Sequence, residues 1–322
     1  MEANALDRTY AYFYDGSNWQ ISLPRIPKDD PIVSSLLAIR PFIIRIGIAF
    51  EKVAAIKFLF ATGILLNQHL ALTCPYHFDP IQWAGQRIPL TKIYVCAADP
   101  ANPALFSLTK SNASVIEATL LQRGLHKDRM AKWKALEDDT SDLAIIRLVK
   151  SAAHLHVDDH FDPKFDSSLL SKSISIPIFL IGINGEFHDY RDLIPYRYIN
   201  GFANVTIDQL NNHHQVNRKS VSLGRLLGEF PSQKQYAMHN CTSLAESSGS
   251  VTLDSTERFL GIHCGVSNSR QDKDKEFFFT EDTFNKFLSV DTTEFHEFIR
   301  EAILPNIDNK QQAEKWQQSL TK

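Results

Sequence analysis

Residues 43–73 read IIRIGIAFEKVAAIKFLFATGILLNQHLALT, and this stretch decides the fold class. It holds three short apolar runs, at 43–50, 57–66 and 70–73, with polar residues between the last two. Short apolar runs bounded by polar or turn-forming residues are typical of buried strands. The stretch therefore predicts three consecutive strands.

The same pattern continues along the rest of the chain. Further strand candidates lie at residues 92–97, 115–122, 143–149, 176–183, 203–210, 250–253 and 259–263. Few helical periods separate them, and short strands at this spacing are typical of an all-β sandwich or barrel.

Helical spacing is confined to a few segments. Apolar residues recur three and four positions apart at 284–288 and 293–303, and Thr292 or Thr293 is placed to cap the second of these. A short helix is also expected at 128–137. Near the other end, Pro24, Pro27, Pro31 and Pro41 favour an extended N-terminal arm over regular structure.

Composition narrows the class of protein. A chain of 322 residues is one large domain with additions, or two domains. Its formal net charge of -3 gives no reason to expect a nucleic-acid or membrane-surface partner. The most apolar stretch, 53–66, is interrupted by Lys57 and is too short to span a bilayer.

The N-terminal residues and the cysteines predict the compartment. No basic segment followed by an apolar run opens the sequence, so we expect a cytoplasmic protein, with delivery into a host cell or non-classical export left open. The four cysteines form no CxxC pair and are expected to be free thiols. Their spacing lacks metal-site regularity, so we expect no metal. Glycine is scarce and no segment resembles a phosphate-binding glycine loop, so we expect no cofactor.

Three segments carry residues suited to a nucleophilic serine site. Residues 62–77 end on His77, residues 138–148 place Asp142 directly before an apolar strand, and the small-residue turn 241–251 presents Ser248. A serine hydroxyl needs a base to take its proton, and histidine does this best near neutral pH. A carboxylate on the far ring nitrogen fixes the tautomer, and a tight turn supplies backbone N–H groups to an oxyanion.

These segments resemble the chymotrypsin-like serine peptidases, especially the branch that includes the glutamyl endopeptidases. Thr62-Gly63 and Leu72-Thr73 leading to His77 match one family motif, and Asp-Leu-Ala-Ile-Ile-Arg-Leu at 142–148 matches another. Ser-Gly-Ser at 248–250 and Leu-Gly-Ile-His-Cys-Gly at 260–265 match two more, in the family's order.

The resemblance covers about residues 43–290 and implies an all-β fold of two six-stranded antiparallel β-barrels with the site between them. The arm 1–42 and a helical extension 291–322 are then additions to that domain. It implies a catalytic triad of His77, Asp142 and Ser248, with the backbone N–H groups of Glu246 and Ser248 as the oxyanion hole.

The chain departs from the family pattern at the site itself. Three residues separate Thr73 from His77 where the family has two, and Glu246 stands where the family has glycine. The competing site residues are His69 in a predicted turn, Asp138 and Asp139 among loop acids, and Ser247 one position before Ser248. The Gly-Ser pair that follows favours Ser248.

The resemblance also implies a substrate preference. In the glutamyl endopeptidases the matching histidine, here His263, lines the primary specificity pocket, and a hydroxyl at the position of Ser243 assists it. Glu, Asp or Gln before the cleaved bond would suit such a pocket, and a purely structural His263 is the other interpretation.

The predicted function is therefore a serine endopeptidase that acts on protein or peptide substrates. The alternative is a protease-like protein of weak or no activity that binds a peptide or partner. An acyl hydrolase of another fold would show a Gly-x-Ser-x-Gly elbow, which the sequence lacks.

Overall fold

A computed structural model gives the coordinates of the chain. It describes residues 9–14, 19–21, 30–52, 55–75, 78–97, 115–124, 142–155, 157, 161–165, 176–196, 206–213, 219–229, 236–244, 246–266, 270–271, 277–278, 284–318 and 320. No helix among these residues is long and apolar enough to cross a membrane.

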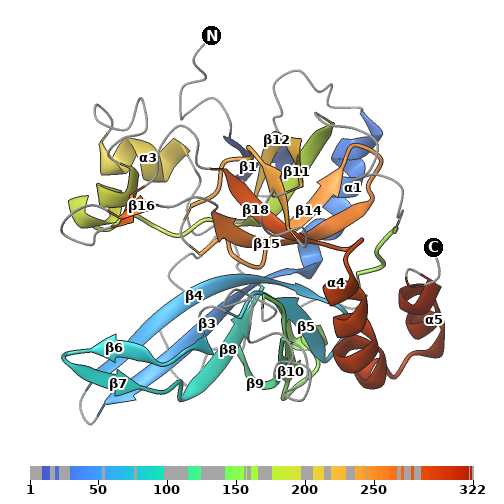
Figure 1. Ribbon diagram of the computed structural model, residues 1–322, viewed down its shortest axis with the longest axis horizontal. Coiled ribbons are helices and arrows are strands. Elements are labelled where there is room, and N and C mark those ends of the chain that lie inside the picture. Colours follow the sequence, from blue (N-terminus) through green and yellow to red (C-terminus); the bar gives the residue numbers. More distant parts are fainter. Residues whose placement is uncertain are drawn as a thin grey trace.

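The first half of the chain forms a closed six-stranded antiparallel barrel, blue to green in Figure 1, with strand order β10-β5-β4-β3-β8-β9. Its strands are β3 (Ile43–Lys52), β4 (Ala55–Leu65), β5 (Leu70–Thr73), β8 (Lys92–Cys96), β9 (Val115–Arg123) and β10 (Ala144–Leu148). The alternate residues Ile44, Ile46, Ile48 and Phe50 of β3 belong to the core of this barrel, as the period of two in a strand requires.

The second half forms another barrel, which lies above the first in Figure 1. Its six strands follow the order β11-β14-β15-β18-β13-β12, and pairing of β12 with β11 closes the ring. They are β11 (Pro177–Ile183), β12 (Lys219–Glu229), β13 (Tyr236–His239), β14 (Val251–Asp254), β15 (Phe259–Val266) and β18 (Asn285–Ser289). The prediction of two six-stranded antiparallel barrels is therefore confirmed.

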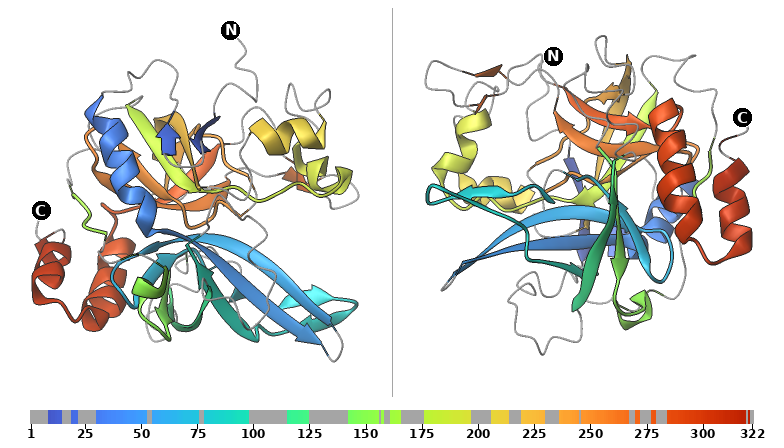
Figure 2. Two further views of the ribbon diagram at one scale, coloured as in Figure 1. Left: turned by 180° about the vertical axis from the view of Figure 1, so that it is seen from behind. Right: turned by 60° about the horizontal axis from the view of Figure 1, so that its bottom comes forward.

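Segments from both ends of the chain add to this double barrel. Strand β1 (Thr9–Tyr14) pairs with β12 and with β2 (Trp19–Ile21), and helix α1 (Pro31–Ile39) precedes the first barrel. At the other end, α4 (Thr293–Phe298), the π-helical turn η7 (Ile299–Ile303), the 3-10 turn η8 (Leu304–Asn306) and α5 (Lys310–Gln318) pack at one side of the molecule (Figures 1 and 2).

The remaining described elements are short. They are η2 (Arg40–Phe42), β6 (Ile81–Trp83), β7 (Gln86–Ile88), η4 (Ala152–Leu155), η5 (Tyr190–Tyr196), α3 (Ile207–His213), β16 (Arg270–Gln271) and β17 (Phe277–Phe278).

Three local predictions were wrong. Residues 207–210 of the strand expected at 203–210 belong to helix α3, and the helical spacing at 284–288 belongs to β18, the final strand of the second barrel. The arm contains α1, because Asp30 caps the helix and Pro31 occupies its first turn, where a missing N–H costs nothing. The helix at 293–303 is confirmed, with Thr292 as its cap, while the helix expected at 128–137 lies outside the described residues.

Candidate active site

The turn that carries Ser248 is packed tightly against the first barrel. Gly249 has φ +94°, and a Cβ there would lie 1.9 Å from the Thr62 carbonyl oxygen and 2.6 Å from Thr73 Oγ1. The Thr62 N–H donates to the Ser248 carbonyl at 3.0 Å, and Gly249 N–H donates to the His263 carbonyl at 2.8 Å. Only glycine meets both the backbone angle and the close approach at position 249.

Glu246, two residues before Ser248, also has a left-handed backbone, with φ +69°. Its carbonyl accepts from Thr62 Oγ1 at 3.1 Å, and its carboxylate pairs with Arg45 Nη2 at 2.6 Å. Burial raises the pKa of Glu246, although the Arg45 charge acts in the opposite direction. The backbone shape expected of glycine is thus present, and a glutamate adopts it.

Two backbone N–H groups of this turn, those of Glu246 and Ser248, are the candidates for binding a ligand. Within the residues that the structure describes, neither the Glu246 N–H nor the Ser248 N–H donates to a protein acceptor. These two donors lie two positions apart, on either side of Ser247, in a turn with left-handed residues, and such a pair can receive an anion together.

Asp142 is buried, at 1 % exposure, just before β10. Its Oδ2 accepts a hydrogen bond from the hydroxyl of Tyr236, itself fully buried on β13. Cys264 Sγ lies 3.8 Å from the Asp142 carbonyl oxygen. Asp142 belongs to the first half of the chain, yet two side chains of the second barrel contact it.

Strand register brings the three predicted segments together. Thr73, four residues before His77, pairs with Ala144, two residues after Asp142. Adjacent residues of β15 reach the other two segments, because the His263 carbonyl accepts from the Ser248 turn and the Cys264 thiol contacts Asp142. His77 itself lies outside the described residues.

The predicted specificity residues are His263, on β15 of the second barrel, and Ser243, in the loop that follows β13. His263 is 1 % exposed, and its Nδ1 lies 3.2 Å from Nε2 of the buried His239. Burial lowers the pKa of His263 to about 3 and that of His239 well below its usual range, and so favours the neutral form of both rings. The half-buried Ser243 donates to Asn285 Oδ1 at 2.7 Å, and no hydrogen bond joins it to His263.

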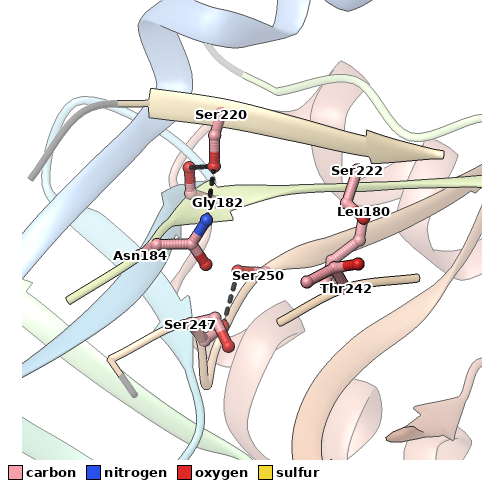
Figure 3. Close-up of a pocket in the computed structure, with 8 residues that line it drawn as sticks. All are labelled: Leu180, Gly182, Asn184, Ser220, Ser222, Thr242, Ser247 and Ser250. Carbon is pink, nitrogen blue, oxygen red and sulfur yellow. Dashed lines mark hydrogen bonds between the residues drawn. The ribbon is translucent and has the colours of Figure 1, made fainter. Parts of the chain in front are cut away.

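A small polar pocket lies beside the nucleophile turn (Figure 3). Leu180 and Gly182 complete a lining of hydroxyl and amide side chains from Asn184, Ser220, Ser222, Thr242, Ser247 and Ser250. The Ser247 hydroxyl donates to the Leu244 carbonyl, and the Asn184 amide donates to Ser220 Oγ at 3.2 Å. Ser247 is therefore buried and engaged in the turn, whereas Ser248 is half-buried.

The competing candidates other than Ser247 belong to other segments of the chain. His69 lies in the turn before β5, as expected, and Asp138 and Asp139 fall on residues that are not described. All four cysteines are among the described residues, where they are buried and form no disulfide. Across the described part of the chain, no group of three His, Cys, Asp or Glu side chains is placed to hold a metal ion.

Sequence reasoning missed Arg45, Tyr236, His239 and Asn285. Tyr236 and His239 lie in a strand that was not predicted, and Asn285 lies in one that was read as helical. Arg45 carried the one available signal, a lone cation inside the apolar run 43–50.

Comparison with solved structures finds proteases of known fold. The protease Rv3671c of M. tuberculosis, in an inactive form, aligns with a TM-score of 0.43 and 12 % identity over 84 % of this chain and 96 % of that chain. A Glu endopeptidase in complex with MPD aligns with a TM-score of 0.46 and 15 % identity over 83 % and 93 %. No protein-family model and no curated protein matches the sequence. The fold assignment rests on the strand pairing of this chain, which closes both barrels.

Proposed function

We propose that the chain is a serine endopeptidase. Ser248 attacks the scissile carbonyl, His77 takes the serine proton and returns it to the leaving amine, and Asp142 orients His77. The N–H groups of Glu246 and Ser248 bind the oxyanion of the tetrahedral intermediate. Water then hydrolyses the acyl-enzyme, with His77 as the base.

The turn at 246–249 is the observation that carries this proposal. A nucleophile turn needs two free N–H donors on one side, and here Glu246 and Gly249 are left-handed while the N–H groups of Glu246 and Ser248 lack protein acceptors within the described residues. The first barrel holds this turn in place. Thr62 donates two hydrogen bonds to it, from its N–H to the Ser248 carbonyl and from its hydroxyl to the Glu246 carbonyl, and Gly249 packs closely on the Thr62 carbonyl.

The surroundings of Asp142 support its role. A buried carboxylate is stable as an anion only where hydrogen bonds replace water, and the Tyr236 hydroxyl supplies one of them. An ionised, fixed carboxylate is what orientation of the histidine base requires.

A preference for Glu, Asp or Gln before the cleaved bond is the finer part of the proposal. The support is that His263 and Ser243, the positions to which the resemblance assigns the specificity pocket, are polar groups that burial keeps without positive charge, so a carboxamide suits such a pocket as well as a carboxylate. Thr242 beside them is uncharged, which disfavours Lys or Arg at this position.

Hydrolysis of fluorescein-labelled casein tests the activity. Wild type should release fluorescent peptides, and Ser248→Ala, His77→Ala and Asp142→Asn should each lose nearly all of that activity. Ser255→Ala, which changes an exposed serine, is the matched control and should match wild type. If casein is hydrolysed equally by Ser248→Ala, or if wild type is inert on casein and on the peptide library below, the proposal is wrong.

A peptide library tests the preference. Cleavage after Glu, Asp or Gln over Ala and Lys is expected, and Ser243→Ala should reduce that ratio without abolishing cleavage. Equal cleavage after all five residues would assign His263 and Ser243 to structure alone.

A further inference from the structure

The turn before Ser248 contains Glu246, whose backbone conformation is unfavourable for a residue with a side chain. Glu246 has φ +69°, and a residue with a Cβ adopts this left-handed region less readily than glycine does. The bond from Thr62 Oγ1 uses the Glu246 carbonyl, which any residue would present. The hydrogen bond from Thr62 therefore does not explain why the side chain at this position is a glutamate.

That side chain is paired with a cation of the first barrel. Glu246 Oε2 lies 2.6 Å from Arg45 Nη2, and the two side chains are only 18 % and 8 % exposed. A charge-assisted hydrogen bond at this distance is strong, and removing one buried partner leaves the other charge uncompensated. The pair thus ties the backbone of the turn to β3.

Arg45 is held independently of Glu246. Strand register fixes it between Thr62 on β4 and Cys96 on β8. Its guanidinium carbon also lies 4.2 Å from the centroid of the Phe60 ring, a cation–π contact. Because strand and ring fix the cation, the ion pair constrains the turn rather than the arginine.

We propose that Glu246 is a positioning residue whose ion pair with Arg45 holds the left-handed turn and so aims the Glu246 N–H at the oxyanion. This inference rests on the proposed function. Glycine adopts a left-handed backbone without help, whereas here the first barrel supplies a charged anchor from outside the turn. The N–H that binds the oxyanion then depends on contact between the two barrels.

Substitutions at position 246 separate backbone strain from charge. Glu246→Ala keeps the Cβ and removes the anchor, so kcat for p-nitrophenyl acetate should fall at least about tenfold with KM little changed, since losing one oxyanion donor costs about 10²–10³. Glu246→Gly removes both the strain and the anchor, and should stay within about threefold of wild type. Arg45→Met should resemble Glu246→Ala, and Arg45→Lys should recover part of the loss.

The control is Lys315→Gln, which breaks the exposed Lys315–Asp162 ion pair and should leave kcat unchanged. Wild-type kcat in Glu246→Ala would overturn the inference. So would a loss in Glu246→Gly equal to that in Glu246→Ala, because the carboxylate would then act otherwise than by holding the backbone.

A second readout is independent of catalysis. Hydrogen–deuterium exchange of the peptide spanning 246–252 should accelerate in Glu246→Ala and Arg45→Met, and remain at the wild-type rate in Lys315→Gln. If wild type does not hydrolyse the ester, the proposed function is wrong. The exchange rates then test by themselves whether the Arg45–Glu246 pair holds the turn. Unchanged exchange in both variants would show that the ion pair does not hold the turn.

Discussion

The Tyr236 hydroxyl donates a hydrogen bond to Asp142 Oδ2, and the two residues come from different barrels. Both are buried, Tyr236 at 0 % and Asp142 at 1 % exposure. The Lys286 ammonium lies 4.2 Å from the centroid of the Tyr236 ring on the same barrel. The acid of the proposed triad is therefore held by a tyrosine that no sequence motif indicated.

Tyr236→Phe should lower both stability and activity. It leaves the ring in place and removes one hydrogen bond to a buried carboxylate, which is worth about 1.5–3 kcal/mol. We expect a loss of that order in the free energy of unfolding, and a fall of about tenfold or more in kcat/KM for p-nitrophenyl acetate because Asp142 is less well oriented.

Tyr94→Phe on β8 is the matched control, since Tyr94 contacts Phe58 and lies outside the site. Denaturant unfolding and the ester assay check both variants. Equal kcat/KM in Tyr236→Phe and wild type would show that Tyr236 does not support Asp142.

The His239–His263 pair predicts that the fold loses stability in acid. Burial lowers the pKa of both rings in the folded chain, that of His263 to about 3, whereas unfolded histidine titrates near ~6.5. As pH falls below about 6.5 the unfolded chain binds protons that the folded chain does not, so this part of the free energy of unfolding is fully present above that pH and is lost below it.

Urea unfolding at pH 7, 6 and 5 measures the effect. Each buried ring contributes up to about 1.4 kcal/mol per pH unit. His263→Gln should flatten the pH dependence relative to wild type, and His154→Gln, at an exposed position, should leave it unchanged. A slope that is the same in wild type and His263→Gln would contradict a neutral buried ring.

The C-terminal helices are predicted to be part of the folding unit. Trp316 of α5 is fully buried. The centroid of its ring lies 5.2 Å from that of Phe165, and the Phe165 centroid lies 5.9 Å from that of Phe259 on β15. Removing a fully buried aromatic side chain costs about 3–5 kcal/mol. Trp316→Ala should lower the free energy of unfolding by that amount, as measured in guanidinium.

Trp83→Ala provides the comparison, because Trp83 is only half-buried on the β6–β7 hairpin. Its loss should be smaller than that of Trp316→Ala. Equal losses would mean that α5 adds nothing to the core.

The first barrel was predictable from sequence and the second only in part. Runs such as 43–50 are apolar apart from one residue, so they are recognised as buried strands without knowledge of the strands they pair with. Strands β12 and β13 carry Lys219, Arg225 and His239 among their residues, and their burial comes from partners distant in sequence. Local pattern cannot supply such long-range pairing.

The candidate site, like the fold, was only partly predictable from the sequence. Asp142 and Ser248 stand in motifs that local chemistry makes recognisable, and contacts with His263 and Cys264 of β15 link their segments. The supports of those residues were not predictable, because the Arg45–Glu246 pair spans 201 residues and the Tyr236–Asp142 pair spans 94. Such contacts follow from the docking of one barrel on the other.

Fluorophosphonate labelling followed by peptide mass spectrometry tests the central claim most directly. The account predicts one adduct per chain on Ser248, formed at a rate that His77→Ala lowers at least about a hundredfold, because the serine then lacks its base. An adduct on Ser247 or on another serine, or labelling of Ser248 that is indifferent to His77, would contradict it.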